Sequence, residues 1–165
     1  MQLIILRGLP GCGKSVIADK LGLYFNNEVV HGDNFKLRYL ENNSDFKKAL
    51  EFSYDKIFKK IKELFENGSE IIVVEELFNN KNLIDKIYNF CKEKEIEIKS
   101  FYVKRDLEKL LEVENNRNRK IKNTKKDFEK LEYEIKEIGI ENEIIIDNNG
   151  TIESSVEIIL EKISK

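Results

Sequence analysis

A glycine-rich segment near the N-terminus constrains the fold more than any other part of the sequence. Residues 1–25 read as a short apolar run, a glycine-rich turn and an amphipathic helix in direct succession. The turn, Gly8-Leu9-Pro10-Gly11-Cys12-Gly13-Lys14-Ser15, matches G-x-x-x-x-G-K-[ST] at every fixed position. This order of strand, loop and helix predicts a phosphate-binding loop at the end of a buried parallel strand.

The residue types of the loop suit the binding of a nucleoside triphosphate. Its glycines allow the backbone N–H groups to converge on a phosphate at a helix N-terminus. We expect Lys14 to be exposed in the loop, to take no part in the core and to reach the β- and γ-phosphates, while Ser15 ligates Mg²⁺. The predicted ATP-binding residues are Gly8, Leu9, Pro10, Gly11, Cys12, Gly13, Lys14, Ser15 and Val16.

Composition narrows the class of protein. The chain has 165 residues, of which 36% are charged, and a net charge of −2, so we expect one domain over residues 1–165 with no global attraction to nucleic acid or membrane. No apolar run approaches the roughly 18 residues of a membrane span. The cysteines, Cys12 and Cys91, have no C-x-x-C partner, which favours a reducing cytoplasm. No obligate protein partner is evident.

Apolar runs alternate with helical patterns along the whole chain. Strand-like runs at residues 3–6, 28–31, 71–74, 96–104 and 143–147 are separated by segments with helical spacing, including one predicted over 121–139. We expect Gly32-Asp33-Asn34 to cap the helix that follows the second strand. The alternation predicts a three-layer α/β fold, a five-stranded parallel sheet with helices on both faces.

Motifs outside the phosphate loop distinguish the classes of phosphate-loop protein. Guanine recognition normally uses N-K-x-D, but residues 80–83 read Asn-Lys-Asn-Leu and lie too early. Residues 147–150 match D-x-x-G only formally. Acids instead stand where parallel strands end, Asp33 after the second strand and Glu75 and Glu76 at the third. A GTPase switch is therefore not favoured.

These motifs resemble those of P-loop kinases in the group that includes polynucleotide 5′-hydroxyl kinases, seryl-tRNA kinase and zeta-toxin-like kinases, within the adenylate-kinase-like superfamily. The resemblance implies the sheet order 2-3-1-4-5 and transfer of the γ-phosphoryl group of ATP, with Mg²⁺, to a hydroxyl. It implies that Asp33, in a D-x-x-R-like pattern, is the general base on the acceptor. Lys36 replaces the arginine of that pattern, and Arg38 follows two residues later, so both are candidate acceptor contacts.

The resemblance also implies a helical lid at about residues 115–126. The group's R-N-x-x-R pattern is matched at Arg119, while Asn115 stands in the place of the first arginine and Arg117 is its substitute, so both arginines are predicted to contact the transferring phosphoryl. The basic run 117–126 could also meet an RNA backbone or be an ordinary solvated surface. For Mg²⁺, Glu75 is favoured over Glu76.

The acceptor stays open: an RNA or DNA end, a tRNA or a small metabolite all present a hydroxyl. The alternative is a non-kinase ATPase, in which Glu75 or Glu76 polarises water, or a nucleotide-dependent binding module.

Overall fold

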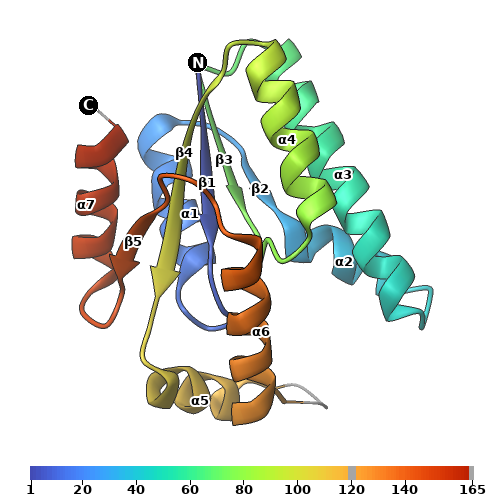
Figure 1. The fold of residues 1–165 in the computed structure, drawn as a ribbon, viewed down its shortest axis with the longest axis vertical. Helices are drawn as coiled ribbons and strands as arrows, with labels where there is room; N and C mark the ends of the chain where they lie inside the picture. Colours follow the sequence, from blue (N-terminus) through green and yellow to red (C-terminus); the bar gives the residue numbers. More distant parts are fainter. Residues whose placement is uncertain (119–121, 164–165) are drawn as a thin grey trace.

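A computed structural model describes residues 1–118 and 122–163 (Figure 1). Its elements, in chain order, are β1 (Gln2–Arg7), α1 (Lys14–Phe25), β2 (Val29–His31), α2 (Gly32–Leu40), α3 (Phe46–Glu66), β3 (Ile71–Glu75), α4 (Lys81–Glu93), β4 (Glu97–Lys104), α5 (Leu107–Asn116), α6 (Lys125–Ile138), β5 (Ile144–Asp147) and α7 (Ile152–Ile163). Within these described ranges, every helix is too short or too polar to span a bilayer.

The five strands form one parallel sheet in the order β2-β3-β1-β4-β5, as predicted. β1 occupies the centre, where Leu6 pairs with Glu75 of β3 and with Phe101 of β4. Because all strands run in the same direction, their carboxyl ends share one edge of the sheet, and Figure 1 shows α5 lying beyond that edge. The phosphate loop, the acids after β2 and β3, and the segment after β4 therefore start from the same side.

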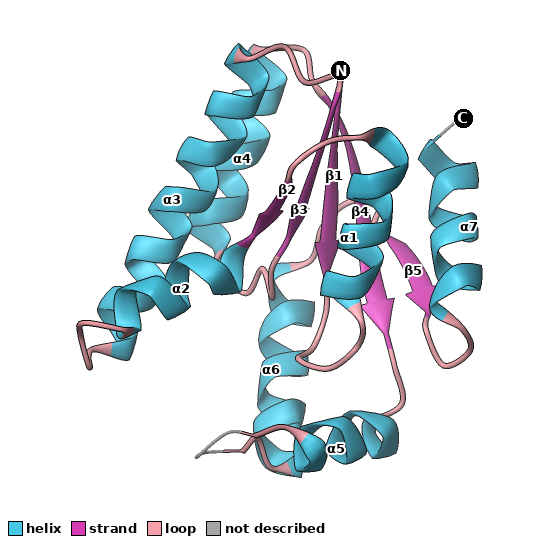
Figure 2. Ribbon diagram, turned by 180° about the vertical axis from the view of Figure 1, so that it is seen from behind, coloured by secondary structure: helices cyan, strands magenta, loops and turns pink. Residues whose placement is uncertain are grey.

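Alternate residues of β1 enter two separate hydrophobic clusters, which explains why its apolar run is unbroken. Ile4 and Leu6 pack with α1 and α7, whereas Leu3 and Ile5 pack with α3 and α4, and all four are fully buried. Figure 1 shows α4 and α6 in front of the sheet, and Figure 2, from behind, shows α1 in front. This is the predicted three-layer α/β arrangement.

Two helices begin at places that differ from the prediction. α2 already starts at Gly32, with His31 at its N-cap, so Asp33 lies inside the first turn and does not cap the helix. α6 starts at Lys125, after the cap residue Thr124, whereas the apolar pattern predicted a helix from 121. Thr124 and Asp127 form a capping box there, with the Thr124 N–H donating to Asp127 Oδ2 at 2.7 Å.

Candidate active site

The loop between β1 and α1 has backbone angles that require glycine. Gly11 and Gly13 have φ angles of 84° and 100°, and Gly13 is the N-cap of α1. Space is also lacking, because a Cβ on Gly8 would lie 2.3 Å from the carbonyl oxygen of Val103. These glycines therefore allow the loop conformation at the N-terminus of α1 that a phosphate cradle requires.

Lys14 is buried, and the expectation that it would be exposed is wrong. It is the first residue of α1, only 9% exposed, and its Nζ donates to the carbonyl oxygen of Leu9 at 3.2 Å. The side chain therefore turns back toward the loop, where its Nζ also lies 3.9 Å from Cys12 Sγ. Burial opposes the charge, but Cys12 and the carboxylates of Glu75, Glu76 and Asp33 outweigh it and raise the pKa of Lys14. The site thus retains a desolvated positive charge.

Ser15 and Glu75 are brought together, although 60 residues separate them. The Ser15 hydroxyl donates to Glu75 Oε1 at 3.2 Å, and Glu75 is the buried last residue of β3. His31 Nδ1 lies 3.0 Å from the same oxygen, and its Nε2 lies 3.0 Å from Asp19. The hydrogen bond to Glu75 raises the pKa of His31. Hydroxyl and carboxylate oxygens are ligands that suit Mg²⁺, so this pair fits the predicted metal.

Glu76, the residue after β3, has different hydrogen-bond partners from Glu75, because successive residues at the end of a strand point to opposite faces. Its carboxylate accepts the N–H of Leu77 at 2.8 Å and covers the start of α2, where a Cβ on Gly32 would lie 1.9 Å from Glu76 Oε2. Burial raises the pKa of Glu76. The Ser15 hydroxyl therefore donates to Glu75 and not to Glu76.

The three predicted acceptor contacts on α2 separate into two places. Asp33 is half-exposed and forms an ion pair with Lys36, one turn further along the helix. Arg38 is exposed and lines, with Phe35 and Tyr39, a cavity of about 410 Å³ between α2 and α3. Five residues correspond to roughly 140° around a helix, which turns Arg38 away from Asp33.

Of the two lid arginines, the structure describes Arg117, and Arg119 lies outside the described residues. Arg117 Nη1 lies 3.1 Å from Glu114 Oε2. Glu114 is 1% exposed and also accepts the backbone N–H and the side-chain amide of Asn123, at 3.0 Å and 3.1 Å. The buried carboxylate of Glu114 therefore links the end of α5 to Asn123, just before the cap of α6. Sequence reasoning missed Glu114, because its i to i+3 spacing from Arg117 is common on helix surfaces.

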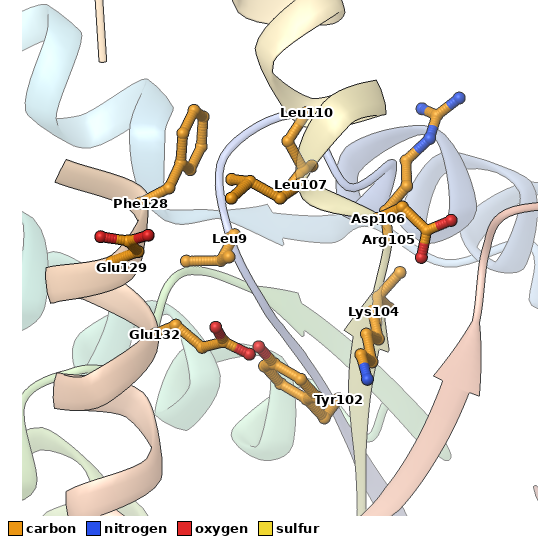
Figure 3. A pocket seen from close by; sticks show the side chains of 11 residues that line it. Leu9, Tyr102, Lys104, Arg105, Asp106, Leu107, Leu110, Phe128, Glu129 and Glu132 are labelled. Carbon is orange, nitrogen blue, oxygen red and sulfur yellow. The ribbon is translucent and has the colours of Figure 1, made fainter. Parts of the chain in front are cut away.

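A cavity of about 210 Å³ adjoins the phosphate loop at Leu9, between β4, α5 and α6 (Figure 3). Its apolar side chains include Leu107, Leu110 and Phe128. Figure 3 shows the Glu132 carboxylate beside the hydroxyl of Tyr102. Burial, with Glu132 adding to it, raises the pKa of Tyr102 to about 12. The hollow therefore combines apolar walls with acidic and phenolic groups.

The loop after β5 also reaches the phosphate loop, through a side-chain contact that sequence reasoning did not predict. The side-chain amide of Asn148 donates to the carbonyl oxygen of Cys12 at 2.7 Å, and Asn148 is 1% exposed. The only signal was its position just past the last strand, at the edge of the sheet where sites lie.

Comparison with known proteins places the chain in a family. A family model described as an AAA domain matches residues 3–137. The chain belongs to this AAA domain family. A search of curated proteins finds no match to the sequence of this AAA-domain protein.

Solved structures with the same fold cover almost the whole AAA-domain protein. A Chloroflexus aurantiacus protein with a provisional kinase assignment is 14% identical, with 97% of each chain covered and a TM-score of 0.73. A sugar kinase from Janibacter sp. is 13% identical, over 99% of this chain and 95% of that one, with a TM-score of 0.68. Deoxyadenosine kinase from M. mycoides, with bound dATP, is 16% identical, over 99% of this chain and 100% of that one, with a TM-score of 0.61.

At these identities the likeness shows the fold, which is that of P-loop kinase-like NTPases. That fold implies that the AAA-domain protein binds a nucleotide.

Proposed function

We propose that the chain is an ATP- and Mg²⁺-dependent kinase that transfers the γ-phosphoryl group to a hydroxyl acceptor. The observation that carries the proposal is the contact of Ser15 with Glu75 at the N-terminus of α1, directly beside the buried charge of Lys14. A phosphate cradle, a cation and a pair of metal-type oxygens at one point suit phosphoryl transfer. Two of the structural neighbours are named as kinases of a sugar and of a nucleoside, which supports the class.

Each residue has a proposed role. The loop and Lys14 hold the phosphates, and Ser15 and Glu75 would hold Mg²⁺, which when bound neutralises phosphate charge. Among the described residues, no group of three or more His, Cys, Asp or Glu side chains could hold a metal alone, so phosphate oxygens would complete the shell. Asp33 takes the proton of the acceptor hydroxyl as its oxygen bonds to the γ-phosphorus, and the bond to the bridging oxygen breaks to release ADP.

The lid is proposed to consist of residues 115–126 within one domain spanning 1–165. Arg117 and Arg119 would steady the transferring phosphoryl there. The Glu114 contact with Arg117 supports this role, because it holds the guanidinium at the carboxyl end of α5, on the side of the sheet where the phosphate loop lies.

Incubation with γ-labelled ATP tests the proposal. Nucleic-acid, tRNA and small-metabolite pools are supplied separately with Mg²⁺, and the label is expected in a hydroxyl-bearing compound of one pool. Release of free phosphate at the same rate with and without every pool would favour the alternative ATPase. Saturable ATP binding without turnover would favour a binding module.

A substitution at the metal pair gives a second test. Glu75→Gln keeps the shape and can still accept the Ser15 hydrogen bond, but it removes the negative charge. We expect the Mg²⁺ concentration for half-maximal ATP turnover to rise about tenfold, a cost of about 1.4 kcal/mol. Glu76→Gln is the matched control, since Glu76 accepts from Leu77 instead, and it should leave the Mg²⁺ requirement unchanged. An equal Mg²⁺ requirement in the parent, Glu75→Gln and Glu76→Gln would show that Glu75 is not a metal ligand.

A further inference from the structure

The peptide between Cys12 and Gly13 lies in the middle of the phosphate loop. For the loop to bind a phosphate, the N–H of Gly13 must point into the cradle. The peptide group is planar and trans, so its N–H and C=O point in opposite directions. Whatever holds the Cys12 carbonyl outward therefore also aims the Gly13 N–H inward.

Asn148 holds that carbonyl from the opposite end of the chain, 136 residues away. Its Nδ2 donates to the Cys12 oxygen at 2.7 Å. The contact is tight, because a Cβ on Gly13 would lie 2.4 Å from the same Nδ2. Both the amide and the carbonyl are buried, since Asn148 is 1% exposed and Cys12 is fully buried. Water therefore does not replace this hydrogen bond easily.

The orientation of the Asn148 amide is defined by its other neighbours. A carbonyl oxygen can only accept, so the NH₂ group must face Cys12. The amide oxygen accepts from the Ser155 hydroxyl at 2.8 Å, and Ser155 is fully buried on α7. The backbone N–H of Asn148 donates to the carbonyl of Lys104 on β4, at 2.8 Å. β4 thus anchors the backbone of Asn148, while α7 and the phosphate loop fix its side chain.

We propose that Asn148, oriented by Ser155, is a positioning residue that sets the phosphate loop in its nucleotide-binding conformation. It acts through the peptide of Cys12 and Gly13 and does not itself touch the nucleotide. The inference rests on the nucleotide site of the proposed function. Without the amide donor, the Cys12 carbonyl is buried and unpaired, and the adjacent glycines let the peptide rotate at little steric cost.

The test measures ADP affinity by calorimetry on variants whose folding is checked by circular dichroism. ADP is the probe because the loop cradles the phosphates nearest the nucleoside. Asn148→Asp keeps the size but replaces the donor by an oxygen facing an oxygen. We expect about a tenfold or greater loss of ADP affinity. Ser155→Ala, which frees the amide to rotate, should weaken ADP binding in the same direction by a smaller factor.

Asn27→Asp is the matched control. Asn27 also donates its side-chain amide to a backbone carbonyl, that of Ile71 at 3.0 Å, but outside the phosphate loop. It should lower the melting temperature and leave ADP affinity unchanged. ADP affinities of folded Asn148→Asp and Ser155→Ala within twofold of the parent would overturn the inference while the proposed function stands. A parent that does not bind ADP would instead refute the proposed function, and this inference with it.

Discussion

Lys14→Ala is expected to lower phosphoryl transfer by about 10²- to 10³-fold or more while the protein stays folded. The ammonium group is desolvated at the N-terminus of α1, where an interaction with developing phosphate charge is much stronger than in water. Folding should tolerate the change, because removing the charge also removes the cost of burying it, which offsets the loss of the hydrogen bonds to Leu9 and Cys12. Steady-state turnover and a thermal melt measure the two effects.

The matched control for this substitution is Lys20→Ala on the same helix. Lys20 is partly exposed and pairs with Glu153 on α7 at 3.0 Å, so its loss should leave turnover within about twofold of the parent and change stability by at most about 1 kcal/mol. Equal turnover by parent and Lys14→Ala would refute the phosphate-loop assignment.

Asp33→Asn is expected to lower turnover by about 10²- to 10⁴-fold with little change in ATP–Mg²⁺ affinity. Asparagine has nearly the same shape and can still hydrogen-bond a hydroxyl, but it cannot take the proton. Asp33 is half-exposed in the first turn of α2, where solvent and an acceptor can reach it. A separate measurement of nucleotide binding distinguishes loss of chemistry from loss of substrate.

Helix capping is the competing role for Asp33, and the structure gives the N-cap of α2 to His31 instead. Asp45 is a true cap, since its side chain accepts the N–H of Lys48 at 3.1 Å. Asp45→Asn is therefore the control, and it should leave turnover unchanged because asparagine caps as well as aspartate. An Asp33→Asn protein with more than about a third of the parental turnover would rule out the general base.

The fold was predictable because its signals are local and periodic. Runs such as Leu3 to Leu6 are buried on both faces and therefore read as continuous apolar strands. The sheet order came from the resemblance and is confirmed. The starts of α2 and α6 were not predictable from apolar spacing, because cap residues such as His31 and Thr124 lie outside the apolar stripe.

The candidate site was predictable where topology alone brings residues together. Parallel strands end at one edge, so Ser15 and Glu75 could be expected to meet. Side-chain directions were not predictable, which is why Lys14 was expected to be exposed and Arg38 was grouped with Asp33. Contacts between distant segments leave no pattern in one sequence.

The partly buried pair of Arg7 with Glu143 shows the same limit. Two hydrogen bonds of 2.5 Å and 2.9 Å join these side chains across 136 residues. A strand-end arginine and a glutamate before the last strand each resemble ordinary surface charges until the fold brings them together.

The stoichiometry of one reaction tests the central claim most directly. The parent protein is incubated with γ-labelled ATP, Mg²⁺ and the acceptor pool that takes up label, and ADP, labelled acceptor and free phosphate are quantified together. The account predicts one labelled acceptor for each ADP formed, with little free phosphate. Free phosphate equal to ADP, with no label in any hydroxyl-bearing compound, would contradict it.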